Sequence, residues 1–195
     1  MMETLRDLLV QRAARLQERP ALSAPGWGTL TWTAWRSRVE GVALGLLAQD
    51  LPSGTAIHSA TGGPWDWACE VAAACSGLRW DRSGIPVDAD LLGGPRFNDA
   101  EGRGPYHARE NELDAATPFQ AGCSHGELLA RLRRLNASLG WDHETRLRIP
   151  RAALPTAEAR AALWSLLYAG GHAELVDGPA GEWHGPGRFD LLGLT

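Results

Sequence analysis

Lysine is absent from this chain of 195 residues, and all 19 of its basic residues are arginines. Lysine is the usual point-charge partner of nucleotide phosphates and the usual amine of Schiff-base chemistry. A reaction that needs either group is therefore excluded for this chain unless a partner chain supplies the lysine.

Long apolar runs are absent as well. No run approaches the roughly 20 residues that cross a bilayer, and the N-terminal residues 1–7 carry acids and no apolar core of a secretory signal. The three cysteines, Cys69, Cys75 and Cys123, form no C-x-x-C pair. Reduced thiols in a cytosol explain them most simply. The sequence therefore predicts a cytoplasmic protein with no membrane partner.

Strong charge and paired metal ligands are also missing. A net charge of -4 gives no broad attraction to nucleic acid. The six histidines form no H-x-x-x-H or H-E-x-x-H pair, which are common helical arrangements of zinc ligands. We therefore expect no nucleic-acid partner, no metal site and no cofactor.

What is present is the alternation of an α/β protein. Apolar periodicity and capping residues predict helices near 4–17, 33–49, 64–76, 124–139 and 156–169. Short apolar runs predict strands near 21–23, 29–32, 55–59, 78–80, 145–149, 173–177 and 189–194. This order indicates a layered parallel (or mixed) sheet with flanking helices. We expect one domain over 1–195, in which a loop-rich connection, 93–112, joins an α/β half at 1–92 to another at 113–195.

The segment 121–128, Ala-Gly-Cys-Ser-His-Gly-Glu-Leu, has two interpretations. Gly122 to Gly126 spells G-x-S-x-G, the pattern of a hydrolase nucleophile elbow. Ser124 and Glu127 also spell the S-x-x-E of a helix capping box, directly before an apolar periodic run. The capping interpretation is favoured, because a cap contributes about 1 kcal/mol and explains the serine without chemistry.

A serine hydrolase remains the alternative. Ser124 would be the nucleophile, and the base and the orienting acid would follow it in the chain. The candidates are His172 or His184 as the base and Asp142 or Asp177 as the acid. Against this, the residues before Gly122 make a poor buried strand, and no oxyanion segment of the HGGG type lies upstream.

The order of several weak motifs resembles one family. Residues 4–9 with 19–22, then 30–35, 54–59 and 63–77, resemble in order the opening passages of acyl-CoA synthetases and other adenylate-forming (AMP-binding) enzymes. Residues 124–129, Ser-His-Gly-Glu-Leu-Leu, resemble the family's THxNLL, and 167–176 resemble its LLAGATVVL. The chain resembles a truncated, degenerate first part of the family's N-terminal domain.

The departures from the family pattern concern its chemistry. The glycine-rich phosphate loop should lie just before Ser124, where this chain has Thr117, Pro118, Phe119 and Gln120, followed by Gly122. Such a loop binds phosphate through tightly turned backbone N–H groups. Here phenylalanine stands in place of the family's lysine and glutamine in place of a glycine. Ala153 replaces the histidine of the L-P-x-x-H segment, and later nucleotide motifs lie beyond residue 195.

The resemblance therefore implies an AMP-binding-like domain without ligase activity. Residues 117–120 and Gly122 would be the remnant of a nucleotide loop. Part of a larger sheet leaves an edge and apolar surface to cover, which predicts a homodimer. We expect such a domain to bind a small acyl or aryl ligand or a protein partner.

Overall fold

The computed structural model describes residues 2–92, 109, 111–120, 122–179, 183–187 and 189–194. The helices are α1 (Leu5–Leu16), α2 (Trp32–Leu47), α3 (Pro64–Cys75), α4 (Ala89–Leu92), α6 (His125–Leu139) and α7 (Ala157–Ala169), with the 3-10 helices η2 (Arg151–Ala153) and η3 (Phe189–Leu192). The strands are β1 (Pro20–Ala24), β2 (Gly28–Thr31), β3 (Ala56–His58), β4 (Arg79–Trp80), β5 (Ile85–Pro86), β6 (Pro118–Gln120), β7 (Cys123–Ser124), β8 (Arg146–Pro150) and β9 (His172–Val176).

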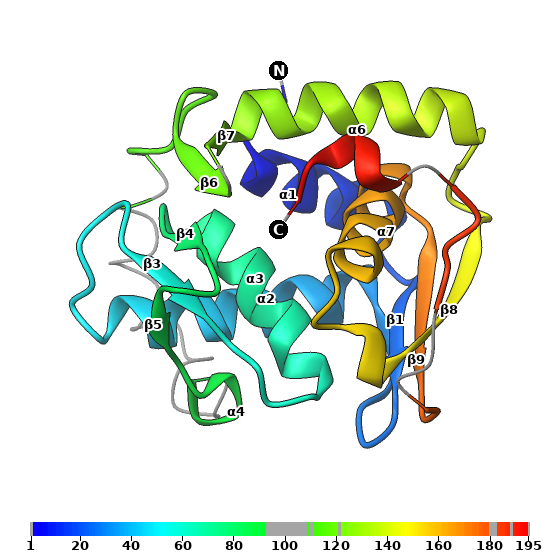
Figure 1. The fold of residues 1–195 in the computed structure, drawn as a ribbon, viewed down its shortest axis with the longest axis horizontal. Coiled ribbons are helices and arrows are strands. Elements are labelled where there is room, and N and C mark those ends of the chain that lie inside the picture. The colour runs from blue at the N-terminus through cyan, green and yellow to red at the C-terminus, as the bar shows by residue number, and fades with distance from the viewer. Residues whose placement is uncertain are drawn as a thin grey trace.

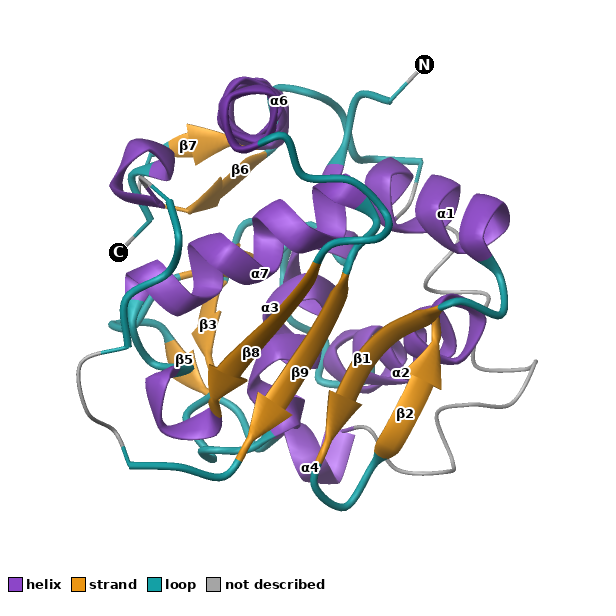
Figure 2. Ribbon diagram, turned by 90° about the vertical axis from the view of Figure 1, so that its right-hand side faces the viewer, coloured by secondary structure: helices purple, strands orange, loops and turns teal. Residues whose placement is uncertain are grey.

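Two sheets enclose a central layer of helices (Figure 1). The first sheet has the order β2-β1-β9-β8, in which only the β1–β2 pair is antiparallel. The second is parallel, with the order β4-β3-β5. Figure 2 shows the four-stranded sheet in front of the helices, which cover its rear face. A hairpin of β6 and β7 forms the third, antiparallel pair and leads into α6.

Capping residues explain where the helices begin. Thr4 and Asp7 form a reciprocal capping box on α1, and Thr156 caps α7 by accepting from the Ala159 N–H group. Pro64 occupies the first turn of α3, where its missing N–H costs nothing. Gly140 ends α6 in the left-handed region at φ 66°, a conformation that glycine adopts without strain.

The core lies between the two sheets. The side of α1 that faces it carries Leu5, Leu8 and Leu9, all fully buried. Almost every residue of α3 is buried, because α1, α2 and the β3–β4 sheet pack around it. The small residues 72–74, all alanine, permit this close packing.

The fold class predicted from the sequence is confirmed, and so are the five long helices and six of the seven strands. The strand predicted at 189–194 is wrong, since η3 occupies 189–192 and buries Phe189 and Leu192 against α6 and α7. A short apolar run buries side chains equally well as a helical turn, so periodicity could not separate the two.

Two further expectations are not decided by the fold. Most of the connection at 93–112 lies outside the described residues, and the single-domain division stays a prediction.

In the part of the chain that the structure describes, no helix has the length and apolarity needed to cross a membrane.

Candidate functional site

Ser124 is the N-cap of α6. Its Oγ accepts a hydrogen bond from the Glu127 N–H group at 3.3 Å, and the Glu127 carboxylate accepts one from the Ser124 N–H group at 2.8 Å. This is the capping box predicted from the sequence, and that prediction is confirmed.

The other amides at the start of α6 are also occupied by the chain itself. The His125 N–H group donates to the Thr117 carbonyl at 3.0 Å, and the Gly126 N–H group donates to the Ala115 carbonyl at 2.9 Å. Free N–H groups at a helix start are what bind phosphate. The start of α6 therefore offers no such group, and the Glu127 carboxylate adds a negative charge beside it.

The segment expected to replace the phosphate loop is a closed hairpin. Pro118 pairs with Ser124 and Gln120 with Cys123, and Gly122 makes the turn at φ 72°. Phe119 is 1% exposed and meets the Trp164 ring edge-on at 5.6 Å. The side chain at the family's lysine position is thus a core residue that points into the protein.

Gln120 joins a buried polar cluster, which we name the Glu70 cluster: Glu70, Gln120, Arg160 and Trp164. The Glu70 carboxylate accepts from the Gln120 amide and from the Trp164 indole N–H group, the latter at 2.9 Å. Arg160 Nε lies 3.7 Å from Glu70 Oε2, and both side chains are almost fully buried. Each partner offsets the cost of burying the other, and the cluster ties α3, β6 and α7 together.

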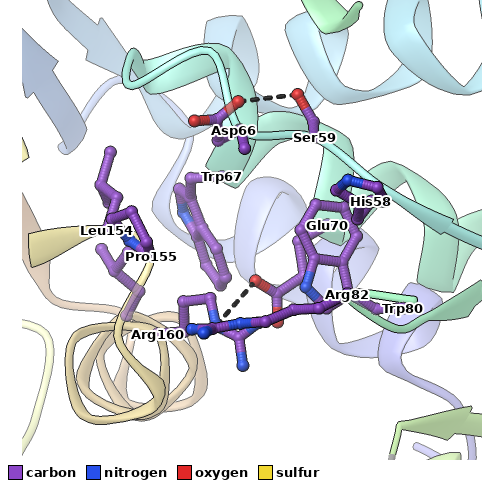
Figure 3. A pocket seen from close by; sticks show the side chains of 12 residues that line it. His58, Ser59, Asp66, Trp67, Glu70, Trp80, Arg82, Leu154, Pro155 and Arg160 are labelled. Atoms are coloured by element: carbon purple, nitrogen blue, oxygen red, sulfur yellow. Dashed lines mark hydrogen bonds and ion pairs between the residues drawn. The ribbon is translucent and has the colours of Figure 1, made fainter. Parts of the chain in front are cut away.

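A cavity of about 280 Å³ opens next to this cluster, between β3, α3 and the start of α7 (Figure 3). The residues that line it are His58, Ser59, Ala60, Asp66, Trp67, Glu70, Trp80, Arg82, Leu154, Pro155, Arg160 and Leu163. Figure 3 shows Trp67 on one side of the cavity and Trp80 on the other. A cavity with aromatic walls and several convergent polar groups is a candidate small-molecule site.

Both acidic residues that line the cavity already have donors. Asp66 Oδ1 accepts from the Ser59 hydroxyl at 2.7 Å and from the Thr61 N–H group at 2.9 Å, and Asp66 Oδ2 accepts from the Gly62 N–H group at 2.8 Å. Glu70 is occupied by the cluster. These carboxylates are therefore structural, and Asp66 holds the loop between β3 and α3.

Two further donors belong to residues that line the same cavity. The Trp80 indole nitrogen is buried and has no hydrogen-bond partner among the described residues. Arg82 is exposed and makes no ion pair with any described residue. A buried N–H group without an acceptor costs about 1–3 kcal/mol. The cavity therefore favours a planar ligand that carries an acceptor oxygen or a negative charge.

The residues of the hydrolase alternative lie in separate places. His172 Nε2 lies 2.8 Å from Ser23 Oγ, not from Ser124. Asp177 forms an ion pair with Arg151, and His184 lies beside Glu158 at 3.5 Å. Asp142 accepts from the Glu144 N–H group in a turn at 2.9 Å. Strand β7, which contains Ser124, and strand β9, which begins at His172, lie on opposite sides of Figure 1.

The described residues contain no group of three or more His, Cys, Asp or Glu side chains placed to hold a metal ion. All three cysteines are free and buried. Burial raises the pKa of the Cys69 thiol, so this group is a packing residue and not a ready nucleophile.

Sequence reasoning missed the Glu70 cluster. A signal was present, because Glu70 interrupts an apolar helix between Cys69 and Val71, and Arg160 interrupts an alanine-rich one. A lone acid and a lone base on two buried helices indicate a buried pair. The two residues are 90 positions apart, so the spacing of residues within one helix could not predict that they form a pair.

No family model and no curated protein matches the chain at the level of sequence. Solved structures do match its fold. The N-terminal subdomain of Klebsiella oxytoca NpsA, in complex with 3-hydroxyanthranilyl-AMSN, gives a TM-score of 0.68 at 14% identity over 91% of this chain and 54% of that one. A putative long-chain-fatty-acid CoA ligase from Rhodopseudomonas palustris gives 0.59 at 17% identity over 89% of this chain and 57% of that one.

These matches confirm the expected architecture. The chain spans little more than half the length of the structures it matches. It shares the fold of about half of the NpsA N-terminal subdomain and of the putative CoA ligase.

Proposed function

We propose that this chain is an adenylate-forming-like domain without ligase activity that binds a small aromatic carboxylate in the cavity between β3, α3 and α7. The observation that carries the proposal is the buried indole N–H group of Trp80, which has no acceptor among the described residues and borders an aromatic-walled cavity. A carboxylate or hydroxyl oxygen of the ligand would accept from it once the indole edge turns toward the cavity, because the nitrogen itself is buried.

The dimensions and charge of the cavity support this ligand class. A volume of about 280 Å³ suits one aromatic ring with its substituents. Trp67 and Trp80 supply flat apolar walls, and Arg82 supplies a cation for the carboxylate. The matched NpsA structures contain 3-hydroxybenzoyl-AMSN and anthranilyl-AMSN, which suggests hydroxybenzoates and aminobenzoates as the first ligands to test.

The closed start of α6 supports the absence of ligase activity. Its amides bind the chain's own carbonyls and Ser124, and Phe119 fills the core at the family's lysine position. A nucleotide phosphate would have to displace these contacts and approach the Glu127 carboxylate, in a chain that has no lysine.

The experiment is a titration of 3-hydroxybenzoate and anthranilate monitored by tryptophan fluorescence. Wild type should show a saturable change, because two indoles line the cavity. The Trp80→Phe variant keeps the apolar wall and removes the N–H donor, and it should weaken binding by about tenfold. Arg82→Gln should weaken binding of the acid but not of the matching amide. Equal affinity in wild type and both variants would contradict the assignment.

We propose further that the domain is a cytoplasmic homodimer, with free thiols as the support for the compartment. Ile85 and Leu91 are the large apolar residues with the greatest exposure among those described, at 48% and 71%. They border a groove of about 310 Å³ next to β5, which is an edge strand of its sheet. A second copy would cover this surface. Sedimentation velocity should show a dimer that Leu91→Glu dissociates, and a monomeric wild type at micromolar concentration would contradict the proposal.

A further inference from the structure

Ser23 and His172 face each other across two adjacent strands. Ser23 lies on β1 and His172 begins β9, and the two strands are parallel neighbours with Leu22 opposite Ala173. Ser23 Oγ lies 2.8 Å from His172 Nε2. This is the separation of a serine nucleophile from its general base.

Glu174 supplies a negative charge near the histidine. It lies two residues after His172 on the same strand and therefore on the same face of the sheet. Its Oε1 is 4.0 Å from His172 Nδ1. That ring nitrogen is buried and has no hydrogen-bond partner among the described residues. If Nε2 accepts the Ser23 proton, Nδ1 must carry a hydrogen. Glu174 is near enough to stabilise the charged ring, but at 4.0 Å it is beyond hydrogen-bond distance of Nδ1.

The Ser23 hydroxyl has a second hydrogen-bond neighbour, and either oxygen of that pair can be the donor. The Thr29 Oγ1 atom lies 2.8 Å from Ser23 Oγ across the β1–β2 pair. When Thr29 donates this bond, Ser23 donates to His172. Two adjacent strands thus place a serine within hydrogen-bond distance of a histidine and a glutamate beside that histidine.

A hollow and a cation lie beside the histidine. A cavity of about 140 Å³ is lined by Arg19, Pro20, His143, Glu144, Arg146 and His172. Arg146 is opposite His172 in the register of β8 and β9. Its guanidinium is a donor for the oxygen that becomes negative when a carbonyl is attacked, because Arg19 is already bound to Glu144 at 2.6 Å.

We propose that Ser23, His172 and Glu174 form an esterase site that acts on small activated esters. Ser23 Oγ bonds to the carbonyl carbon while His172 Nε2 takes its proton. The bond to the leaving phenol or thiol then breaks, and His172 protonates the leaving group. Water attacks the acyl-serine, His172 takes the water proton and returns it to Ser23, and the free acid leaves. Activated esters are the expected class, since the backbone N–H groups of sheet strands are used in pairing and cannot form an oxyanion hole.

This site does not depend on the aromatic-carboxylate cavity. Ser23 and His172 belong to the four-stranded sheet, whereas that cavity lies between β3, α3 and α7. Sequence reasoning named His172 as a candidate base but paired it with Ser124. The serine within hydrogen-bond distance of His172 is 149 residues away from it in sequence, which no local motif reveals.

The test is labelling with a fluorophosphonate, followed by peptide mass spectrometry, on the full chain. Wild type should be labelled at Ser23. Ser23→Ala and His172→Gln should lose at least tenfold in labelling rate, Glu174→Gln should lose less, and Ser124→Ala, the matched serine control, should keep the wild-type rate. Circular dichroism checks that each variant is folded. Absence of label on folded wild type, label on Ser124, or a rate unchanged in His172→Gln would each overturn the proposal.

A pH profile separates a base from a merely structural histidine. Burial lowers the pKa of His172, against the raising effect of Glu174 and with a smaller lowering effect of Arg146. The other charged or titratable groups that border the hollow are Arg19, His143 and Glu144. The labelling rate should rise with pH below about 6.5, the usual pKa of histidine, and be level at neutral pH. A rate that does not change between pH 4.5 and 7 would contradict the role of His172 as the base.

Discussion

Ser124 and Glu127 cap the same helix reciprocally, each accepting a hydrogen bond from the other's backbone N–H group. A cap of this kind contributes about 1 kcal/mol. Ser124→Ala should therefore lower the free energy of unfolding by about 1 kcal/mol, measured by urea denaturation. Ser124→Asp is the control that keeps a capping oxygen and should be nearly neutral. An alanine variant as stable as wild type would contradict the capping role.

His125 links α6 to α1 and makes stability depend on pH. Its Nδ1 accepts from the Leu5 N–H group at 3.3 Å, and burial lowers the pKa of His125 to about 4. The unfolded chain, with an ordinary histidine pKa of about 6.5, binds the proton more readily, so stability is complete above that pH and is lost as the pH falls toward 4.

The size of this loss is measurable. A difference of two to three pKa units corresponds to about 3 kcal/mol between pH 7 and pH 4. His125→Asn retains an acceptor but cannot titrate, and it should remove this part of the pH dependence. The check is urea denaturation of both proteins at several pH values. If the free energy of unfolding depends on pH in the same way in both proteins, His125 is not the titrating group.

Substitutions of Phe119 test whether this residue belongs to the hydrophobic core. The side chain is 1% exposed and packs against His125 and Trp164. Phe119→Ala should cost about 3–5 kcal/mol, whereas Phe119→Leu should cost much less because it keeps most of the volume. Thermal or urea unfolding of both variants provides the measurement. A cost below about 0.5 kcal/mol for alanine, the range of an open surface loop, would contradict the closed hairpin.

The contributions of Glu70 and Arg160 to the free energy of unfolding should depend on one another. Removing one partner leaves a buried charge, which costs about 3–5 kcal/mol. Glu70→Leu and Arg160→Leu should each be strongly destabilising, and the double variant should lose less than the sum of the two. A double-mutant cycle by urea denaturation measures this coupling. Additive losses would mean that the two side chains are stabilised separately.

Local signals predicted the elements of this fold better than their assembly. Thr4, Ser124 and Thr156 marked three helix starts because each cap is made within four residues of sequence. The separation of the strands into three pairing groups could not be predicted, since pairing such as Leu22 with Ala173 joins distant segments. The same reason hid the contacts of Glu70 with Gln120 and of Ser23 with His172.

The expectation that the phosphate site is lost rested on residue identities, namely Phe119 and Gln120 at the positions where the family that the chain resembles has a lysine and a glycine. The structure also shows which hydrogen bonds the backbone of this segment makes. Ala115 and Thr117 present their carbonyls to the first amides of α6, a contact that no residue-type pattern indicates because it is made by the main chain.

The most direct test of the account is a calorimetric titration of 3-hydroxybenzoate, carried out with and without saturating Mg-ATP, with ATP–pyrophosphate exchange measured on the same sample. The account predicts that the acid binds with an affinity that ATP does not change, that ATP alone gives no heat of binding, and that no exchange occurs. Binding of ATP, acid binding that requires ATP, or exchange above background would contradict it.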